Sequence, residues 1–165
     1  MVNRILFCVF LLISVEVSIS KAYAQIGEYN TLVGVTAGTS IGASVKQFVS
    51  QAGAAELLIY RRWKGWVGTV LFEHHIKIRE FRDLEWYVGG GAHYGFWKDG
   101  KGEPPWVYKI DKNYRTYGID AILGIEYNIN QSNFYCGAFW KPAYNFTSFT
   151  GFWGDEVSAT LKYSF

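Results

Sequence analysis

The amino-acid sequence predicts an all-β protein, an eight-stranded antiparallel up-and-down transmembrane β-barrel. Eight segments alternate apolar and polar residues with period two, and aromatic residues, which favour strands, make up 19% of the chain. No apolar run after Gln25 is long enough for a membrane-spanning helix. Side chains two apart on a strand share a face, so the alternation indicates a sheet whose two faces meet different surroundings.

The first residues have the pattern of a secretory signal. Arg4 precedes an apolar run over 5–15 that is too short to cross a bilayer, and the sequence Ala-Tyr-Ala at 22–24 has the small-x-small form of a cleavage site. We therefore expect residues 1–24 to be a cleaved signal peptide and residues 25–165 to form one barrel domain. The protein is expected to be exported through the periplasm to the bacterial outer membrane.

Eight strands and their connections can be placed along the mature segment. The predicted strands are 28–37, 41–50, 54–62, 66–77, 84–97, 114–129, 133–145 and 152–165. An even number brings both chain ends to the periplasmic side. The connections on that side, 51–53, 78–83 and 130–132, are short, while the longest, 98–113 and 146–151, face outward. Outer-membrane barrels have this asymmetry.

The last predicted strand shows the alternation most clearly. We expect one set to face lipid and the other the lumen: Val157, Ala159, Leu161, Tyr163 and Phe165 against Glu156, Ser158, Thr160, Lys162 and Ser164. In strand 114–129 the outward set includes Ile119, Leu123 and Ile125. A soluble periplasmic barrel with an apolar ligand inside is the alternative, and it predicts that Leu161, Tyr163 and Phe165 point inward.

Aromatic residues gather near the ends of the predicted strands, which suggests two girdles at headgroup depth. The outer group is Trp63, Trp66, Trp97, Tyr144 and Trp153, and the periplasmic group is Trp86, Tyr127, Phe134, Tyr163 and Phe165. Glycines at 89, 91 and 95 alternate with outward aromatic and aliphatic residues. They are expected to leave room in a narrow lumen for long side chains from neighbouring strands.

The segments LEWYVGGGAHYGFW at 84–97, GIDAILGIEYN at 118–128 and FWGDEVSATLKYSF at 152–165 resemble small eight-stranded bacterial outer-membrane barrels of the OmpA and OmpX shape. The resemblance covers essentially the whole mature segment and implies the barrel fold and its location, with no catalytic residues. It also implies that the terminal Phe165, with Leu161 and Tyr163, is the signal read by the barrel-insertion machinery.

Charged residues at inward positions predict an ion-pair network in the lumen. Counting from the turns places Asp120 roughly opposite Lys141, with Glu156 and His93 as neighbours, and Glu126 and Lys162 are inward as well. Buried charges must be paired, and an eight-stranded barrel is just wide enough to be filled by its side chains. We therefore expect a filled lumen, with a gate or proton-sensitive plug as the functional alternative.

Other sequence features offer little support for chemistry. His74 and His75 are adjacent on a strand and point to opposite faces, so a metal site is not expected there, and no cofactor is predicted. A lipid-modifying hydrolase or acyltransferase remains an alternative, but no serine on a flanking strand faces His74 within hydrogen-bond reach.

The outer end offers candidate contacts. Arg61, Arg62, Trp63 and Lys64 are expected at the rim, where basic side chains contact lipopolysaccharide phosphates and an indole lies at headgroup depth. The loop 98–113 is the predicted surface for an extracellular partner. A net charge of +2 gives no indication of nucleic-acid binding.

The sequence thus predicts a non-enzymatic outer-membrane barrel that supports envelope integrity or presents outer loops for recognition. Two alternatives stay open besides the soluble barrel. One is a lipid-modifying enzyme that acts as a lipid A acyl hydrolase or acyltransferase, and the other is a narrow gated channel.

Overall fold

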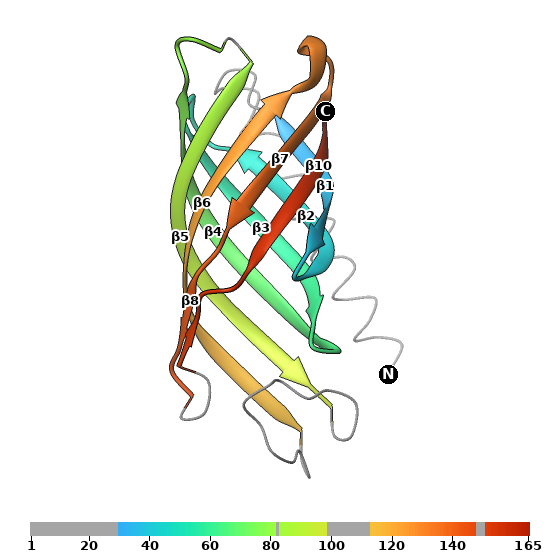
Figure 1. The fold of residues 1–165 in the computed structure, drawn as a ribbon, viewed down its shortest axis with the longest axis vertical. Helices are drawn as coiled ribbons and strands as arrows, with labels where there is room; N and C mark the ends of the chain where they lie inside the picture. The colour runs from blue at the N-terminus through green and yellow to red at the C-terminus, as the bar shows by residue number, and fades with distance from the viewer. Residues whose placement is uncertain (1–29, 82, 99–112, 148–150) are drawn as a thin grey trace, which may run out of the picture.

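The computed structural model describes residues 30–81, 83–98, 113–147 and 151–165, and these form a closed antiparallel barrel (Figure 1). The predicted signal peptide and nearly all of the predicted partner loop lie outside the described residues. The strands are β1 (Thr31–Gly38), β2 (Ile41–Phe48), β3 (Gly53–Arg62), β4 (Gly65–Lys77), β5 (Leu84–Trp97), β6 (Tyr114–Asn128), β7 (Phe134–Trp140), β8 (Ala143–Asn145), β9 (Phe152–Trp153) and β10 (Val157–Ser164). One 3-10 turn, η1 (Ile129–Gln131), follows β6.

Each strand from β1 to β6 pairs with the next, and β1 pairs with β10, which closes the wall. β7 and β8 both pair with β6 in a continuous register across the interruption at Pro142, so together they form the seventh barrel strand. β9 and β10 form the eighth. The predicted eight-stranded, up-and-down antiparallel fold is therefore confirmed.

The eighth barrel strand contains a β-bulge. Trp140 pairs with Val157 and Ala143 pairs with Trp153, so three residues of this strand stand opposite two of its neighbour. The additional residue reverses the inward and outward alternation at that point. Trp153 and Glu156, three residues apart, consequently both lie inside the barrel.

The two ends of the barrel differ, as Figure 1 shows. At the end drawn uppermost, here called the turn end, the connections 49–52, 78–83 and 129–133 are short and the chain finishes at Phe165. The other end, here called the loop end, carries 98–113 and 146–151 as well as the tight turns at 39–40 and 63–64. The wall is taller there on the side of β5 and β6, which have 14 and 15 residues against eight in β1.

The outer surface is apolar around the whole circumference. Large hydrophobic side chains that are 42–66% exposed occur on every strand from β1 to β7 and on β10, among them Val35, Ile59, Phe72, Ile119 and Leu161. A soluble protein rarely exposes a contiguous apolar patch larger than a few hundred Å². The predicted orientation of β6 and β10 is observed, since their apolar residues face outward and their charged residues are buried. Among the described residues, no helix has the length and hydropathy needed to cross a bilayer.

Candidate functional site

The lumen is the candidate functional site, because the buried charged side chains of this barrel converge there. They form two groups. The first, here called the loop-end cluster, consists of Arg62, His93, Asp120, Lys141 and Glu156.

Lys141 is the centre of the loop-end cluster. Its ammonium nitrogen donates to Asp120 Oδ1 at 2.9 Å and lies 3.1 Å from Glu156 Oε1. His93 Nδ1 is 2.9 Å from Asp120 Oδ2, and Arg62 Nη1 donates to Glu156 Oε2 at 2.8 Å. Lys141 directly follows β7, and its backbone N–H donates to the Glu156 carbonyl. This hydrogen bond holds Lys141 against the bulge. These contacts join five of the eight barrel strands: β3, β5, β6, and the seventh and eighth barrel strands.

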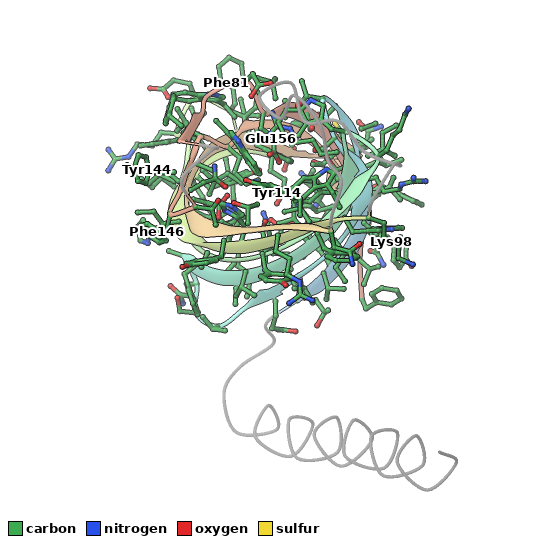
Figure 2. The ribbon with its side chains drawn as sticks, turned by 90° about the horizontal axis from the view of Figure 1, so that it is seen from below. Phe81, Lys98, Tyr114, Tyr144, Phe146 and Glu156 are labelled. Carbon is green, nitrogen blue, oxygen red and sulfur yellow. The ribbon has the colours of Figure 1, made fainter. Side chains whose placement is uncertain are left out.

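Aromatic rings cover the loop-end cluster. Trp153 stacks on His93 with ring centroids 5.2 Å apart, and Trp97 packs edge-on against Trp153 at 6.3 Å. The guanidinium carbon of Arg62 lies 3.9 Å from the ring centroid of Trp63 and 5.2 Å from that of Trp153. Figure 2 looks into the barrel from this end. It shows Glu156 and Tyr114 inside the barrel, whereas Tyr144 and Phe146 point outward.

The Trp63-Lys64 turn explains how an indole reaches this position. Both residues have positive φ, 46° and 62°, as the two central residues of a tight type I′ hairpin turn require. Such a backbone is costly for residues other than glycine and persists where surrounding contacts hold it. Here the Trp63 ring is held against Trp153, with centroids 5.4 Å apart.

The second group, here called the turn-end cluster, consists of Lys46, Glu56, Glu73, Glu126 and Lys162. Lys46 Nζ lies 2.7 Å from Glu73 Oε2, 3.5 Å from Glu56 and 3.4 Å from Glu126. Lys162 Nζ lies 2.9 Å from Glu56 and 3.0 Å from Glu126. Three carboxylates therefore share two ammonium groups, and all five side chains are at most 4% exposed.

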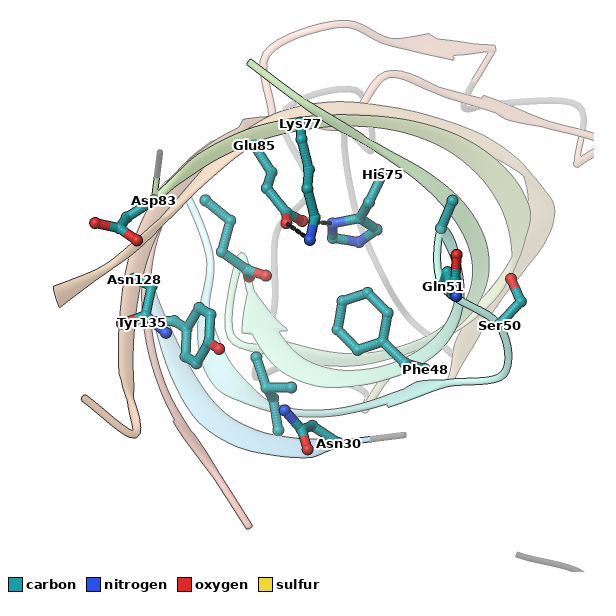
Figure 3. Close-up of a pocket in the computed structure, with 13 residues that line it drawn as sticks. Asn30, Phe48, Ser50, Gln51, His75, Lys77, Asp83, Glu85, Asn128 and Tyr135 are labelled. Atoms are coloured by element: carbon teal, nitrogen blue, oxygen red, sulfur yellow. Dashed lines mark ion pairs between the residues drawn. The ribbon is translucent and has the colours of Figure 1, made fainter. Parts of the chain in front are cut away.

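A cavity of about 790 Å³ adjoins the turn-end cluster (Figure 3). His75 and Glu85 line it, with His75 Nδ1 3.3 Å from Glu85 Oε2, and the His75 ring stacks on Tyr87 at 4.9 Å. Glu126 lines it as well, so the cavity reaches the charged cluster itself. The turn end of the lumen is therefore hollow where the loop end is packed with rings.

Apolar side chains separate the two clusters. Leu58, Leu71, Ile122 and Phe139 are 0–4% exposed and belong to one packed group inside the barrel. Within the described residues, no ion pair joins the turn-end cluster to the loop-end cluster. The lumen is thus hollow at the turn end and filled by side chains in its apolar middle and at the loop end.

Glycines make room for this packing, but the prediction for strand β5 is confirmed only in part, because a Cβ at Gly89 or Gly91 would meet the backbone of β4 and not a lumen side chain. A Cβ at Gly124 would lie 2.3 Å from the Tyr87 ring, and one at Gly95 would lie 2.5 Å from the Trp97 ring. A Cβ at Gly118 would come within 2.8 Å of His93. Each of these three glycines leaves the space that a large inward side chain of the neighbouring strand, or of the same strand, occupies.

The structure places all six predicted lumen residues inside the barrel but divides them. His93, Asp120, Lys141 and Glu156 meet as the strand pairing predicts, and Glu126 and Lys162 belong to the other cluster. The three proposed insertion-signal residues all face outward at the turn end, and the rings of Tyr163 and Phe165 are 5.0 Å apart.

The prediction for the rim is wrong for Arg62 and for part of the outer aromatic group. Arg62 is 2% exposed and paired with Glu156, because the alternation of β3 turns even-numbered residues inward. Trp97 and Trp153 are buried in the lumen, the first through the alternation of β5 and the second through the bulge. Trp63 is half-buried over the lumen, while Arg61 and Lys64 are exposed.

Sequence reasoning missed Lys46, Glu56, Glu73 and Arg62 as members of the two clusters. Period-two alternation was the signal that could have found them, because Glu56 and Arg62 share a parity with inward Leu58 and Tyr60. Glu73 likewise shares its parity with Leu71 on β4.

The two adjacent histidines lie on opposite faces of β4, as the sequence predicts. His75 is 4% exposed in the lumen, and His74 is on the outer surface. The cross-strand partners of His74 are Gly53 and Val88, so neither flanking strand offers it a hydroxyl group at that level.

Comparisons with known proteins find a likeness of fold. No family model and no curated protein matches the chain. Among solved structures, the N-terminal β-barrel domain of OprF from Pseudomonas aeruginosa superposes with a TM-score of 0.66 and 13% sequence identity, over 84% of this chain and 100% of that domain. At this identity the likeness concerns the fold alone, that of a small closed β-barrel domain.

Proposed function

We propose that the protein is a non-enzymatic barrel of the bacterial outer membrane that supports the envelope or presents its outer loops for recognition, with a lumen sealed by its own side chains. One observation carries the proposal: the wall is apolar on its outside around the full circumference and charged on its inside. A lipid bilayer stabilises this arrangement, because the outward apolar side chains contact hydrocarbon. The closed barrel also satisfies every strand hydrogen bond there, which hydrocarbon requires.

The aromatic residues support the same placement. Outward rings occur toward both ends, with Trp86, Tyr127 and Phe134 near the turn end and Trp66 and Tyr144 near the loop end. Aromatic side chains favour the two interfaces of a bilayer, where their rings lie at headgroup depth. The fold likeness to the OprF barrel domain agrees with this placement.

The packed middle and loop end of the lumen support a structural role over conduction. The loop-end cluster and its aromatic cover lie beyond an apolar layer, so water entering the cavity at the turn end meets packed side chains. Insertion of such a barrel would use the outward Leu161, Tyr163 and Phe165 as the signal for the insertion machinery. An extracellular partner, if the barrel has one, would bind through the loop 98–113.

Cell fractionation and gel mobility test the proposal. The protein should be found in the outer-membrane fraction and should migrate faster when unheated than after boiling in detergent, as folded barrels do. In planar bilayers, the wild-type protein should give no single-channel conductance. Recovery in the soluble periplasmic fraction would contradict the membrane placement, and stable conductance would favour the gated-channel alternative.

The enzymatic alternative has its own test. Lipid A from cells with and without the gene should have the same acyl-chain masses by mass spectrometry. A shift by one acyl chain that His74→Ala abolishes would establish lipid-modifying activity and overturn the structural role.

A further inference from the structure

Two arginines and two aromatic rings form a lateral row on the outer surface at the loop end. Arg61 on β3 pairs with Trp66 on β4, Trp66 pairs with Phe96 on β5, and Phe96 pairs with Arg115 on β6. All four residues share the outward face, because their inward neighbours along the strands are buried. This set is here called the cation row.

The guanidinium groups of the cation row lean over the rings between them. The Arg61 Cζ atom is 5.5 Å from the centroid of Trp66, and the Arg115 Cζ atom is 5.9 Å from that of Phe96. Adjacent strands are about 4.8 Å apart, so the two Cα atoms are at most roughly 14 Å apart, and each guanidinium leans over the ring on the strand next to its own. Within the described residues, neither guanidinium forms an ion pair with a carboxylate. Both therefore present their donors to an external anion.

Among residues 30–81, 83–98, 113–147 and 151–165, the exposed positive charge at the loop end lies on this side of the barrel. Lys64 and Lys98, which directly follow or precede the same strands, are also exposed. On the opposite side, the exposed charged group of the β9 to β10 segment is Asp155, whose side chain is 66% exposed. An anion at the outer rim is thus attracted to the face of β3 to β6.

Small residues, here called the trough, form a diagonal patch deeper on the same face. Gly68 is two residues below Trp66, and Ala92, Gly90 and Ala121 continue across β5 and β6, with Gly90 and Ala121 directly paired. A Cβ built at Gly68 would meet no atom within 4 Å, so the surface there is open. Val70, Ile119 and Tyr94, each about half exposed, border the trough with apolar and aromatic surface.

We propose that this face binds one phosphorylated lipid of the outer leaflet, with the arginines of the cation row on its phosphates and an acyl chain in the trough. Arginine suits the headgroup because its planar fork donates two hydrogen bonds to one phosphate. The ring beneath each guanidinium restricts its motion and lowers the entropy lost on binding. The inference rests on the proposed membrane placement. It adds the class of lipid that is bound and the face of the barrel, β3 to β6, that binds it.

Lipid binding by the purified full-length barrel tests the site. The probes are bisphosphorylated lipid A and the same lipid after removal of its phosphates, added to the folded protein in detergent and counted by native mass spectrometry. Arg61→Ala with Arg115→Ala should weaken binding of the bisphosphorylated form about 30-fold, given about 1 kcal/mol for each basic residue near an anionic surface. The charge-matched control, Lys77→Ala with Arg79→Ala at the turn end, should leave binding unchanged.

The trough has a separate test. Gly68→Val fills open space with a residue that favours strands, so the barrel should fold normally while losing several-fold in lipid affinity. Equal binding of both lipid A forms, or unchanged binding in the arginine variant, would overturn the site. Full competition by millimolar inorganic phosphate would reassign it to free phosphate and would overturn the lipid proposal.

Flotation separates this failure from failure of the proposed function. Folded wild-type protein is mixed with phosphatidylcholine vesicles that contain no lipid A and is centrifuged through a density gradient. Protein that stays at the bottom would overturn the membrane placement and the lipid site together. Protein that floats but binds lipid A equally in wild-type and arginine variants would overturn the lipid site alone.

Discussion

The two charged clusters of the lumen both pair basic with acidic side chains, but they differ in how they are closed off from water. The loop-end cluster is covered by Trp97, Trp153 and Trp63, whereas the turn-end cluster borders a cavity of about 790 Å³. Burial makes an unpaired charge expensive in the covered cluster, while water in the cavity can solvate one in the other. The same substitution should therefore cost more at the loop end.

Removing one lysine from each cluster should show the largest difference. Lys141→Met leaves Asp120 with only His93 as a partner and should lower the free energy of unfolding by about 3–5 kcal/mol. Lys162→Met should cost about 1–3 kcal/mol, because Lys46 still contacts both Glu56 and Glu126. Urea unfolding of the refolded barrel measures both, and equal losses would contradict the difference in closure.

Truncating one aromatic side chain at each end compares how tightly the two ends of the lumen are packed. Trp153→Ala removes a 2% exposed ring that packs on His93 and Arg62, and a loss of about 3–5 kcal/mol is expected. Phe48→Ala should cost about 1 kcal/mol, since Phe48 lines the cavity and is only partly buried. The same urea experiment decides, and a larger loss for Phe48→Ala would show that the turn end is the tighter one.

Glycine substitutions extend the comparison from the lumen to the outer wall. Gly124→Ala drives a methyl group into the Tyr87 ring and should destabilise the barrel by about 1–3 kcal/mol. Gly68→Ala meets open space on the outside and should be neutral within about 0.5 kcal/mol. Thermal unfolding monitored by circular dichroism would reveal the order, and a reversed order would contradict the assignment of inner and outer faces.

Cys136 offers the smallest and simplest effect. It is half-buried on the outward face of β7, paired with outward Tyr127 and Leu161. In vesicles, its thiol should react with a charged maleimide more than about tenfold slower than in the urea-unfolded protein, since hydrocarbon excludes the reagent. Equal rates, measured by mass spectrometry, would place this surface in water.

The strands and their faces could be predicted because period-two alternation is a local property of the sequence. β6 and β10 follow it over their whole length, so their outward and inward sets were predicted correctly. Asp120 meets Lys141 and His93 as predicted, but diagonally, because its register partners are Ala143 and Gly91, two residues from each. The location in the outer membrane, by contrast, belongs to the proposed function.

The bulge could not be predicted from alternation. One additional residue between Trp153 and Val157 reverses the faces, and only the pairing with β7 and β8 reveals it. Arg62 was misplaced for a different reason. Its parity with Leu58 and Tyr60 indicates the lumen, but a basic residue at a strand end also suits a headgroup rim. Inside the barrel it pairs with Glu156, 94 positions away in the sequence.

A spin-label scan along β10 tests the central claim most directly. Single cysteines replace residues 157–164 in a Cys136→Ser background, and the accessibility of each label to oxygen and to a polar nickel complex is measured in vesicles. Oxygen accessibility should peak at 157, 159, 161 and 163, the residues that face outward. Peaks at 158, 160, 162 and 164, or high nickel accessibility at the outward set, would contradict a barrel with lipid outside and charge within.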